Sequence, residues 1–160
     1  MRRIGELNPK ILVEAVQEKV AASNVDALLE GVTVVVDGSD NFATRYCVAD
    51  AAARRGVPYV YGAVFRFEGQ VAVFDPARDP TLPCYRCLFP EAPPPELAPN
   101  CSEAGVLGVL PGVVGTLQAT EALKAILGIG RLLDRSVLHI DALTMQFREL
   151  RLPRDPSCQH

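Results

Sequence analysis

Residues 32–41 decide the fold class: they read VTVVVDGSDN, a compact apolar and β-branched run followed at once by carboxylates, a serine and an amide. A short apolar run that ends in a polar turn is typical of a buried parallel strand entering a loop. In open α/β sheets, ligands bind outside the carboxyl ends of the strands. We therefore expect Asp37, Asp40 and Asn41 to lie at a ligand-binding edge of a sheet.

Asp40 is the first candidate for chemistry at this edge. A carboxylate there can hold Mg²⁺, which takes one or two protein oxygens and fills its remaining positions with water and substrate phosphates. The residues alone leave an alternative open, because Asp40 or Asn41 can equally cap the helix that follows.

Outward from this segment, strand and helix patterns alternate along the chain. This alternation predicts an α/β fold, a Rossmann-like mixed sheet with helices on both faces and antiparallel strands towards the C-terminus. The helix after Asn41 should close at Gly56, a residue type favoured just past a helix end. The expected strands are 11–20, 32–36, 59–65, 70–74, 137–140 and 146–152, and the expected helices are 24–30, 41–55 and 111–127, with the end of another at 1–8.

Length and composition indicate one globular domain, residues 1–160. About half of the residues are hydrophobic (49%) and 22% are charged, which argues against disorder. The net charge is −3 and both signs are mixed, so a nucleic-acid partner is not expected. No apolar run reaches the roughly 20 residues that span a bilayer, and no signal peptide is seen, so we expect no membrane partner and a cytoplasmic location.

Five cysteines in such a chain favour metal or thiol chemistry over a disulfide framework. Cys84 and Cys87 form a C-x-x-C within a proline-rich loop at about 75–104. Alone, this pair can be a zinc half-site, a redox pair or a coincidence. A redox pair is expected at a helix N-terminus, so the loop favours zinc. Cys101 lies in the same loop and is open to two readings, a reactive thiol or an inert one, whereas Cys47 reads as a core residue.

Five segments resemble, in order, the motifs of the MoeB/ThiF/HesA family, the bacterial relatives of ubiquitin-activating enzymes. Together they make the resemblance specific, and it extends over roughly residues 6 to 158. The matching segments are 37–45 (DGSDNFATR), the hairpin 61–70 (YGAVFRFEGQ), the first zinc pair 83–90 (PCYRCLFP), the crossover-loop thiol 101–108 (CSEAGVLG) and the helix 118–124 (QATEALK).

The resemblance implies an acyl-adenylate reaction. ATP and the C-terminal glycine carboxylate of a ubiquitin-like β-grasp sulfur-carrier protein, ending in Gly-Gly, would give carrier-AMP and pyrophosphate. It also implies that Asp40 binds the Mg²⁺ of Mg-ATP, that Asn41 and Arg45 lie near the nucleotide, and that Cys101 serves as a thiol intermediate in part of the family. Complete relatives are usually homodimers. The pathway, whether molybdenum cofactor, thiamine, tRNA thiolation or cysteine biosynthesis, is left open.

For the zinc site, the resemblance implies that a second cysteine pair completes the coordination. Here Cys158 is followed by Gln159 and His160, so we expect Cys84, Cys87 and Cys158 as ligands and His160 as a poorly spaced fourth.

The sequence departs from the family in the phosphate-binding parts. Complete members carry a G-x-G-G-x-G loop that wraps nucleotide phosphates with backbone N–H groups, and this sequence contains none. We therefore expect the C-terminal part of the family fold, without its first βαβ unit. Two explanations are considered: a separate N-terminal chain supplies the missing part, or the gene model is truncated. Such a chain should not adenylate a carrier alone. The alternative function is a non-catalytic module that binds the carrier, and a nicotinamide-dependent oxidoreductase is disfavoured.

Overall fold

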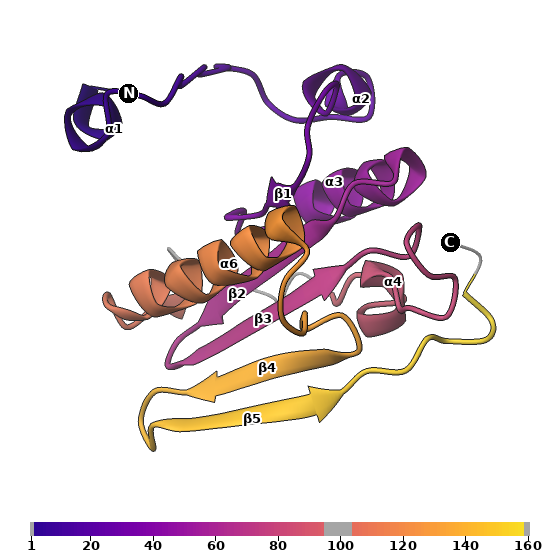
Figure 1. The fold of residues 1–160 in the computed structure, drawn as a ribbon. Coiled ribbons are helices and arrows are strands. Elements are labelled where there is room, and N and C mark those ends of the chain that lie inside the picture. Colours follow the sequence, from indigo (N-terminus) through magenta and orange to yellow (C-terminus); the bar gives the residue numbers. More distant parts are fainter. Residues whose placement is uncertain (1, 95–103, 159–160) are drawn as a thin grey trace.

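The computed structural model describes residues 2–94 and 104–158, which build a mixed sheet with the strand order β1-β2-β3-β4-β5 (Figure 1). β1 pairs with β2 in parallel, and the remaining neighbours are antiparallel. The elements are α1 (Arg2–Leu7), α2 (Val25–Leu28), β1 (Val35–Val36), α3 (Phe42–Arg55), β2 (Tyr59–Phe65), β3 (Glu68–Phe74), α4 (Tyr85–Leu88), α6 (Leu110–Leu127), β4 (Ser136–Asp141) and β5 (Gln146–Arg151).

Alternate residues of β2 and β3 face two different helical layers, because successive side chains of a strand point to opposite faces. On one face, Tyr59, Tyr61 and Phe74 pack in a cluster with residues of α3 and α4. On the other, Val60 and Val73 pack near α6, which lies along β2 and β3 in Figure 1. The predicted α/β fold with helices on both faces of a mixed sheet is confirmed.

Helix α3 has the ends that the sequence predicts. The side chain of Asn41 accepts a hydrogen bond from the Thr44 N–H at 2.9 Å, which satisfies one of the free N–H groups of the first turn. At the other end, Gly56 adopts the left-handed conformation (φ 67°) that terminates the helix. These two caps place α3 directly after the polar segment that follows β1.

The predicted strand at 11–20 is wrong. The residues between α1 and α2 form no strand and are mostly exposed, and in Figure 1 they run apart from the sheet. Apolar residues with partial alternation are not sufficient for a strand, since strand preference depends on packing against a neighbour.

The strand predicted at 32–36 is parallel, as expected, but shorter and less buried. Only Val35 and Val36 pair with β2. The backbone hydrogen bonds between the two strands run from the N–H of Val35 to the carbonyl of Pro58 and from the N–H of Asp37 to the carbonyl of Val60. Val36 is half exposed, since in the described residues β1 is an edge strand. Among the described residues, no helix combines the length and the apolar character that a bilayer span requires.

Candidate functional site

A cavity of about 250 Å³ opens at the carboxyl end of β1, between the segment after that strand and the first turns of α6. This is the edge at which α/β sheets bind ligands. It brings together two of the predicted site residues, Asp40 and Arg45. The cavity is lined by Gly38, Ser39, Asp40, Arg45, Gly62, Ala63, Val64, Pro111, Val114 and Gln118.

Asp40 lies exposed at this cavity, on the turn between β1 and α3. The sequence left open whether Asp40 or Asn41 caps the following helix. The side chain of Asn41 forms this cap. An exposed single carboxylate beside an open cavity suits Mg²⁺, which needs room for water and substrate oxygens in addition to protein ligands.

Arg45 is almost fully buried under the same turn, with 8% of its surface exposed. One of its guanidinium nitrogens, Nη2, donates to the carbonyl of Ser39 at 2.8 Å, and its Nε lies 3.8 Å from Oδ2 of Asp37. The guanidinium also lies over the rings of Phe42 and Tyr61, at 5.8 and 5.5 Å from their centroids. Arg45 therefore links α3 to the backbone that carries Asp40.

Asp37, which the sequence places at this edge of the sheet without assigning it a role, is a buried carboxylate. It accepts a hydrogen bond from the Ser39 N–H at 2.9 Å and one from the hydroxyl of Tyr59 at 2.6 Å. Burial, and then the charge of Asp37, raise the pKa of Tyr59, and burial raises the pKa of Tyr61 to about 12. Both phenols are therefore protonated at neutral pH, and the Tyr59 hydroxyl acts as a donor to Asp37.

Gln118 of α6 closes the floor of the cavity. Its amide donates to the carbonyls of Asp37 (2.7 Å) and Val60 (3.1 Å), so it ties α6 to the end of β1 and the start of β2. A Cβ on Gly62 would lie 2.2 Å from Cδ of Gln118, and a Cβ on Gly69 would lie 2.7 Å from Val114. The two glycines of the hairpin segment 61–70 are thus the positions at which α6 approaches the sheet, a role that their spacing in the sequence did not reveal.

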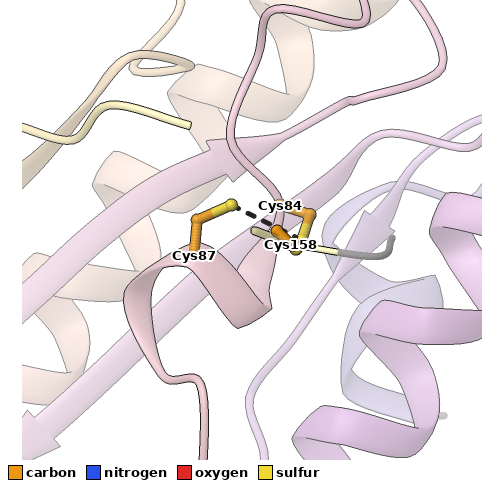
Figure 2. Close-up of side chains that lie close together, drawn as sticks. All are labelled: Cys84, Cys87 and Cys158. Atoms are coloured by element: carbon orange, nitrogen blue, oxygen red, sulfur yellow. Dashed lines mark hydrogen bonds between the residues drawn. The ribbon is translucent and has the colours of Figure 1, made fainter. Parts of the chain in front are cut away.

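The sulfur atoms of Cys84, Cys87 and Cys158 form a second cluster, which Figure 2 shows in close-up. All three lie within 4.8 Å of one another, with 3.8 Å between Cys84 and Cys87 and 3.4 Å between Cys84 and Cys158. Four thiolates at the usual Zn–S distance would be about 3.8 Å apart in a tetrahedron. The three cysteines that the sequence proposes as zinc ligands are therefore brought together with a spacing that fits this ion.

The pair Cys84 and Cys87 lies in a different local structure from the one expected. The segment around Cys84 and Cys87 is not an extended loop, because Cys84 occupies the N-cap position of the short helix α4. Placement in a loop therefore does not separate a zinc site from a redox pair. The third thiol is the stronger indication of a metal site. Burial and then the hydrogen bond with Cys158 raise the pKa of Cys84 to about 12, which is opposite to the shift expected of a reactive thiolate.

Two of the five cysteines of the sequence, Cys47 and Cys101, are not among these three thiols. Cys47 lies on α3, half buried against the core, as its sequence pattern predicts. Cys101 lies outside the described residues, as does His160, so their roles stay predictions.

The chain belongs to the ThiF family, which matches residues 1–160. It is 51% identical to the sulfur carrier protein adenylyltransferase of Thermus thermophilus over 98% of this chain and 59% of that protein. It is 49% identical to the SAMP-activating enzyme E1 of Haloferax volcanii over 95% of this chain and 55% of that protein. The chain thus spans somewhat more than half the length of these two curated relatives.

Solved structures show the same fold at lower sequence identity. The crystal structure of E. coli MccB with MccA-N7isoASN superposes with a TM-score of 0.76 at 16% identity, over 99% of this chain and 49% of that one. The crystal structure of PaaA gives a TM-score of 0.65 at 14% identity, over 96% of this chain and 46% of that one.

Proposed function

We propose that this chain supplies the metal-binding part of a site that adenylates the C-terminal glycine of a ubiquitin-like sulfur-carrier protein. The observation that carries the proposal is the cavity at the carboxyl end of β1, where Asp40 lies exposed beside Arg45. The two relatives are named as a sulfur carrier protein adenylyltransferase and an activating enzyme, which supports the same chemistry.

In this reaction, the glycine carboxylate of the carrier attacks the α-phosphorus of ATP. A carboxyl–phosphate bond forms, the bond to the bridging oxygen breaks, and pyrophosphate leaves with that electron pair. Asp40 would hold a Mg²⁺ ion, which supplies positive charge against the phosphates. Asn41 and Arg45 adjoin Asp40, so we place the nucleotide on this side of the cavity.

The cysteine cluster has a structural role in this proposal. Cys84, Cys87 and Cys158 would hold one zinc ion, which would tie α4 to the segment after β5. α4 packs on α3, the helix that follows Asp40, so the metal would support the site from a distance. Structural zinc sites of this kind contribute folding free energy and do no chemistry.

The test is ATP–pyrophosphate exchange with carriers that end in Gly-Gly. Two proteins are compared: the 160-residue chain, and a hybrid in which residues 1–160 replace the part of the T. thermophilus relative that they match. We expect exchange by the hybrid that depends on both carrier and Mg²⁺. Asp40→Ala should lower its rate by about 10²–10³, the usual effect of removing one preorganised group from such a site.

The matched control is Asp26→Ala, which removes an exposed carboxylate on α2 that pairs with Arg54. It should leave exchange unchanged. A hybrid that exchanges normally with Asp40→Ala would refute the assignment of Asp40. A hybrid that binds carriers without any exchange would favour the alternative, a carrier-binding module without catalysis.

A further inference from the structure

The residue before Asp40 is held by both of its main-chain polar groups. The N–H of Ser39 donates to the carboxylate of Asp37, and its carbonyl accepts from the guanidinium of Arg45. Both partners are buried, and their side chains form an ion pair with each other at 3.8 Å. The turn that carries Asp40 is therefore fixed to a buried pair of charges.

This pair is itself held by its surroundings. Tyr59 on β2 donates its hydroxyl to Asp37, and the amide of Gln118 on α6 donates to the main-chain carbonyl of Asp37. The guanidinium of Arg45 lies over the rings of Phe42 and Tyr61. The contacts come from both faces of the sheet, so a displacement of either helix layer would be transmitted to the turn.

Stability alone does not account for a buried ion pair at this place. Taking two charges out of water costs free energy, and apolar residues of similar volume often stabilise a protein as well or better. In the described residues, moreover, the Nε of Arg45 lies buried without a hydrogen-bond acceptor. What apolar residues cannot do is bond the N–H and the carbonyl of Ser39.

We infer that Arg45, acting with Asp37, is a positioning residue that fixes Ser39 and thereby sets the place of the Asp40 carboxylate at the cavity. Arg45 acts through this turn and does not contact the phosphates of the nucleotide, since its side chain is buried and its Nη2 already donates to the carbonyl of Ser39. The importance of that position for catalysis rests on the proposed function, whereas the control of the turn by Arg45 does not.

The first arm of the test uses the whole 160-residue chain and measures the turn alone. Backbone ¹⁵N relaxation and amide hydrogen exchange are compared between the native chain and Arg45→Met, which keeps much of the length and apolar packing of the side chain. We expect the amide of Ser39 to exchange at least 10-fold faster and the order parameters of Ser39 and Asp40 to fall, while amides in β2 and the middle of α3 keep their protection.

The matched control is Arg54→Met, which removes a second arginine of α3 that makes an exposed ion pair with Asp26. It should leave the turn unchanged. If Arg45→Met fails to fold, Tyr59→Phe decides, because it keeps the packed ring and removes one donor to Asp37; the same loosening of Ser39 is expected. Native-like dynamics of Ser39 and Asp40 in a folded Arg45→Met, or in Tyr59→Phe, would overturn the inference.

The second arm uses the exchange assay with the hybrid protein. For Arg45→Met we expect the Mg²⁺ concentration at half-maximal rate to rise at least 10-fold, with the KM for the carrier unchanged and partial recovery in Arg45→Lys. A raised KM for ATP at saturating Mg²⁺, with a native turn, would instead show direct contact with phosphate and overturn the inference. Absence of exchange in every protein would count against the proposed function, and the first arm would still decide the role of Arg45.

Discussion

The side-chain amide of Gln118 occupies the space directly above Gly62, where a Cβ would lie 2.2 Å from Cδ, 2.4 Å from Nε2 and 2.4 Å from Oε1 of that amide. The contact allows Gln118 to reach the carbonyl of Asp37, after the end of β1, and that of Val60, at the start of β2. The docking of α6 and the floor of the cavity thus depend on a glycine in the middle of β2.

Gly62→Ala should destabilise the protein by about 1–3 kcal/mol, the usual cost of forcing extra atoms into a packed interior. The measurement is the midpoint of chemical denaturation. Gly115→Ala is the matched control on α6, because a Cβ there meets nothing within 4 Å. Alanine is the better helix former, so this control should leave stability unchanged or raise it by up to ~1 kcal/mol. Equal effects of the two substitutions would contradict the close contact.

Gly62 and Gln118 should also show strong energetic coupling. Gln118→Ala removes the amide that donates to the carbonyl of Asp37, whereas the carbonyl of Val60 keeps the N–H of Asp37 as a donor. The lost donor at the Asp37 carbonyl should cost ~1–3 kcal/mol. In that background, Gly62→Ala should cost much less than in the native chain, because the clash has gone. A double-mutant cycle by denaturation should give a coupling of about 0.5–3 kcal/mol. Additive effects would mean that the two side chains do not compete for one space.

Asn41 should act mainly as the cap of α3. Asn41→Ala should lower the free energy of unfolding by about 0.5–2 kcal/mol, and Asn41→Ser should restore most of it, since a serine oxygen can also accept from the first turn. Thermal melting of the three proteins measures this. The hybrid exchange assay then shows whether the Asn41 amide also contacts the nucleotide. If Asn41→Ser has native stability but a KM for ATP raised 10-fold or more, the amide binds the nucleotide as well as capping α3.

Zinc should bind to the purified chain in a ratio of at most one ion per chain. Elemental analysis of the purified chain should show its loss with Cys84→Ser and with Cys158→Ser, because each removes one of the clustered thiols. Cys47→Ser is the matched control, since Cys47 lies on α3 in the packing around the core. A zinc content that survives both substitutions would place the ligands elsewhere.

Much of the fold could be predicted from local signals. The helix at 41–55 carries its own start and stop, an asparagine cap and a left-handed glycine, and both form as expected. The hairpin of β2 and β3 and the antiparallel pair at the C-terminus also follow from strand patterns with turns between them. These features depend on residues close together in the chain, which is why a sequence pattern suffices.

Features that depend on distant contacts could not be predicted in the same way. The residues at 11–20 have apolar side chains but gain no strand partner, and the pattern cannot report a missing neighbour. The role of Asp37 was missed for the same reason. Its partner Tyr59 lies 22 positions away and Gln118 lies 81 positions away, so neither contact leaves a local signal.

The thiol cluster joins Cys84 to a residue 74 positions further along the chain. In the unfolded protein, a metal ion shared by these thiolates would close a ring that contains α6, β4 and β5. The pairing of β3 with β4 joins residues as distant as Glu68 and Asp141, and such long-range pairings slow folding. With the metal bound, the two paired residues are also connected by the chain from β3 to Cys84, the metal, and the chain from Cys158 back to β4. This connection is about half as long as the direct one, so the entropy lost when the two residues meet is smaller. We therefore expect refolding from denaturant to be faster when zinc is added before dilution, so that the ion would influence how quickly the sheet forms as well as how firmly its end is held.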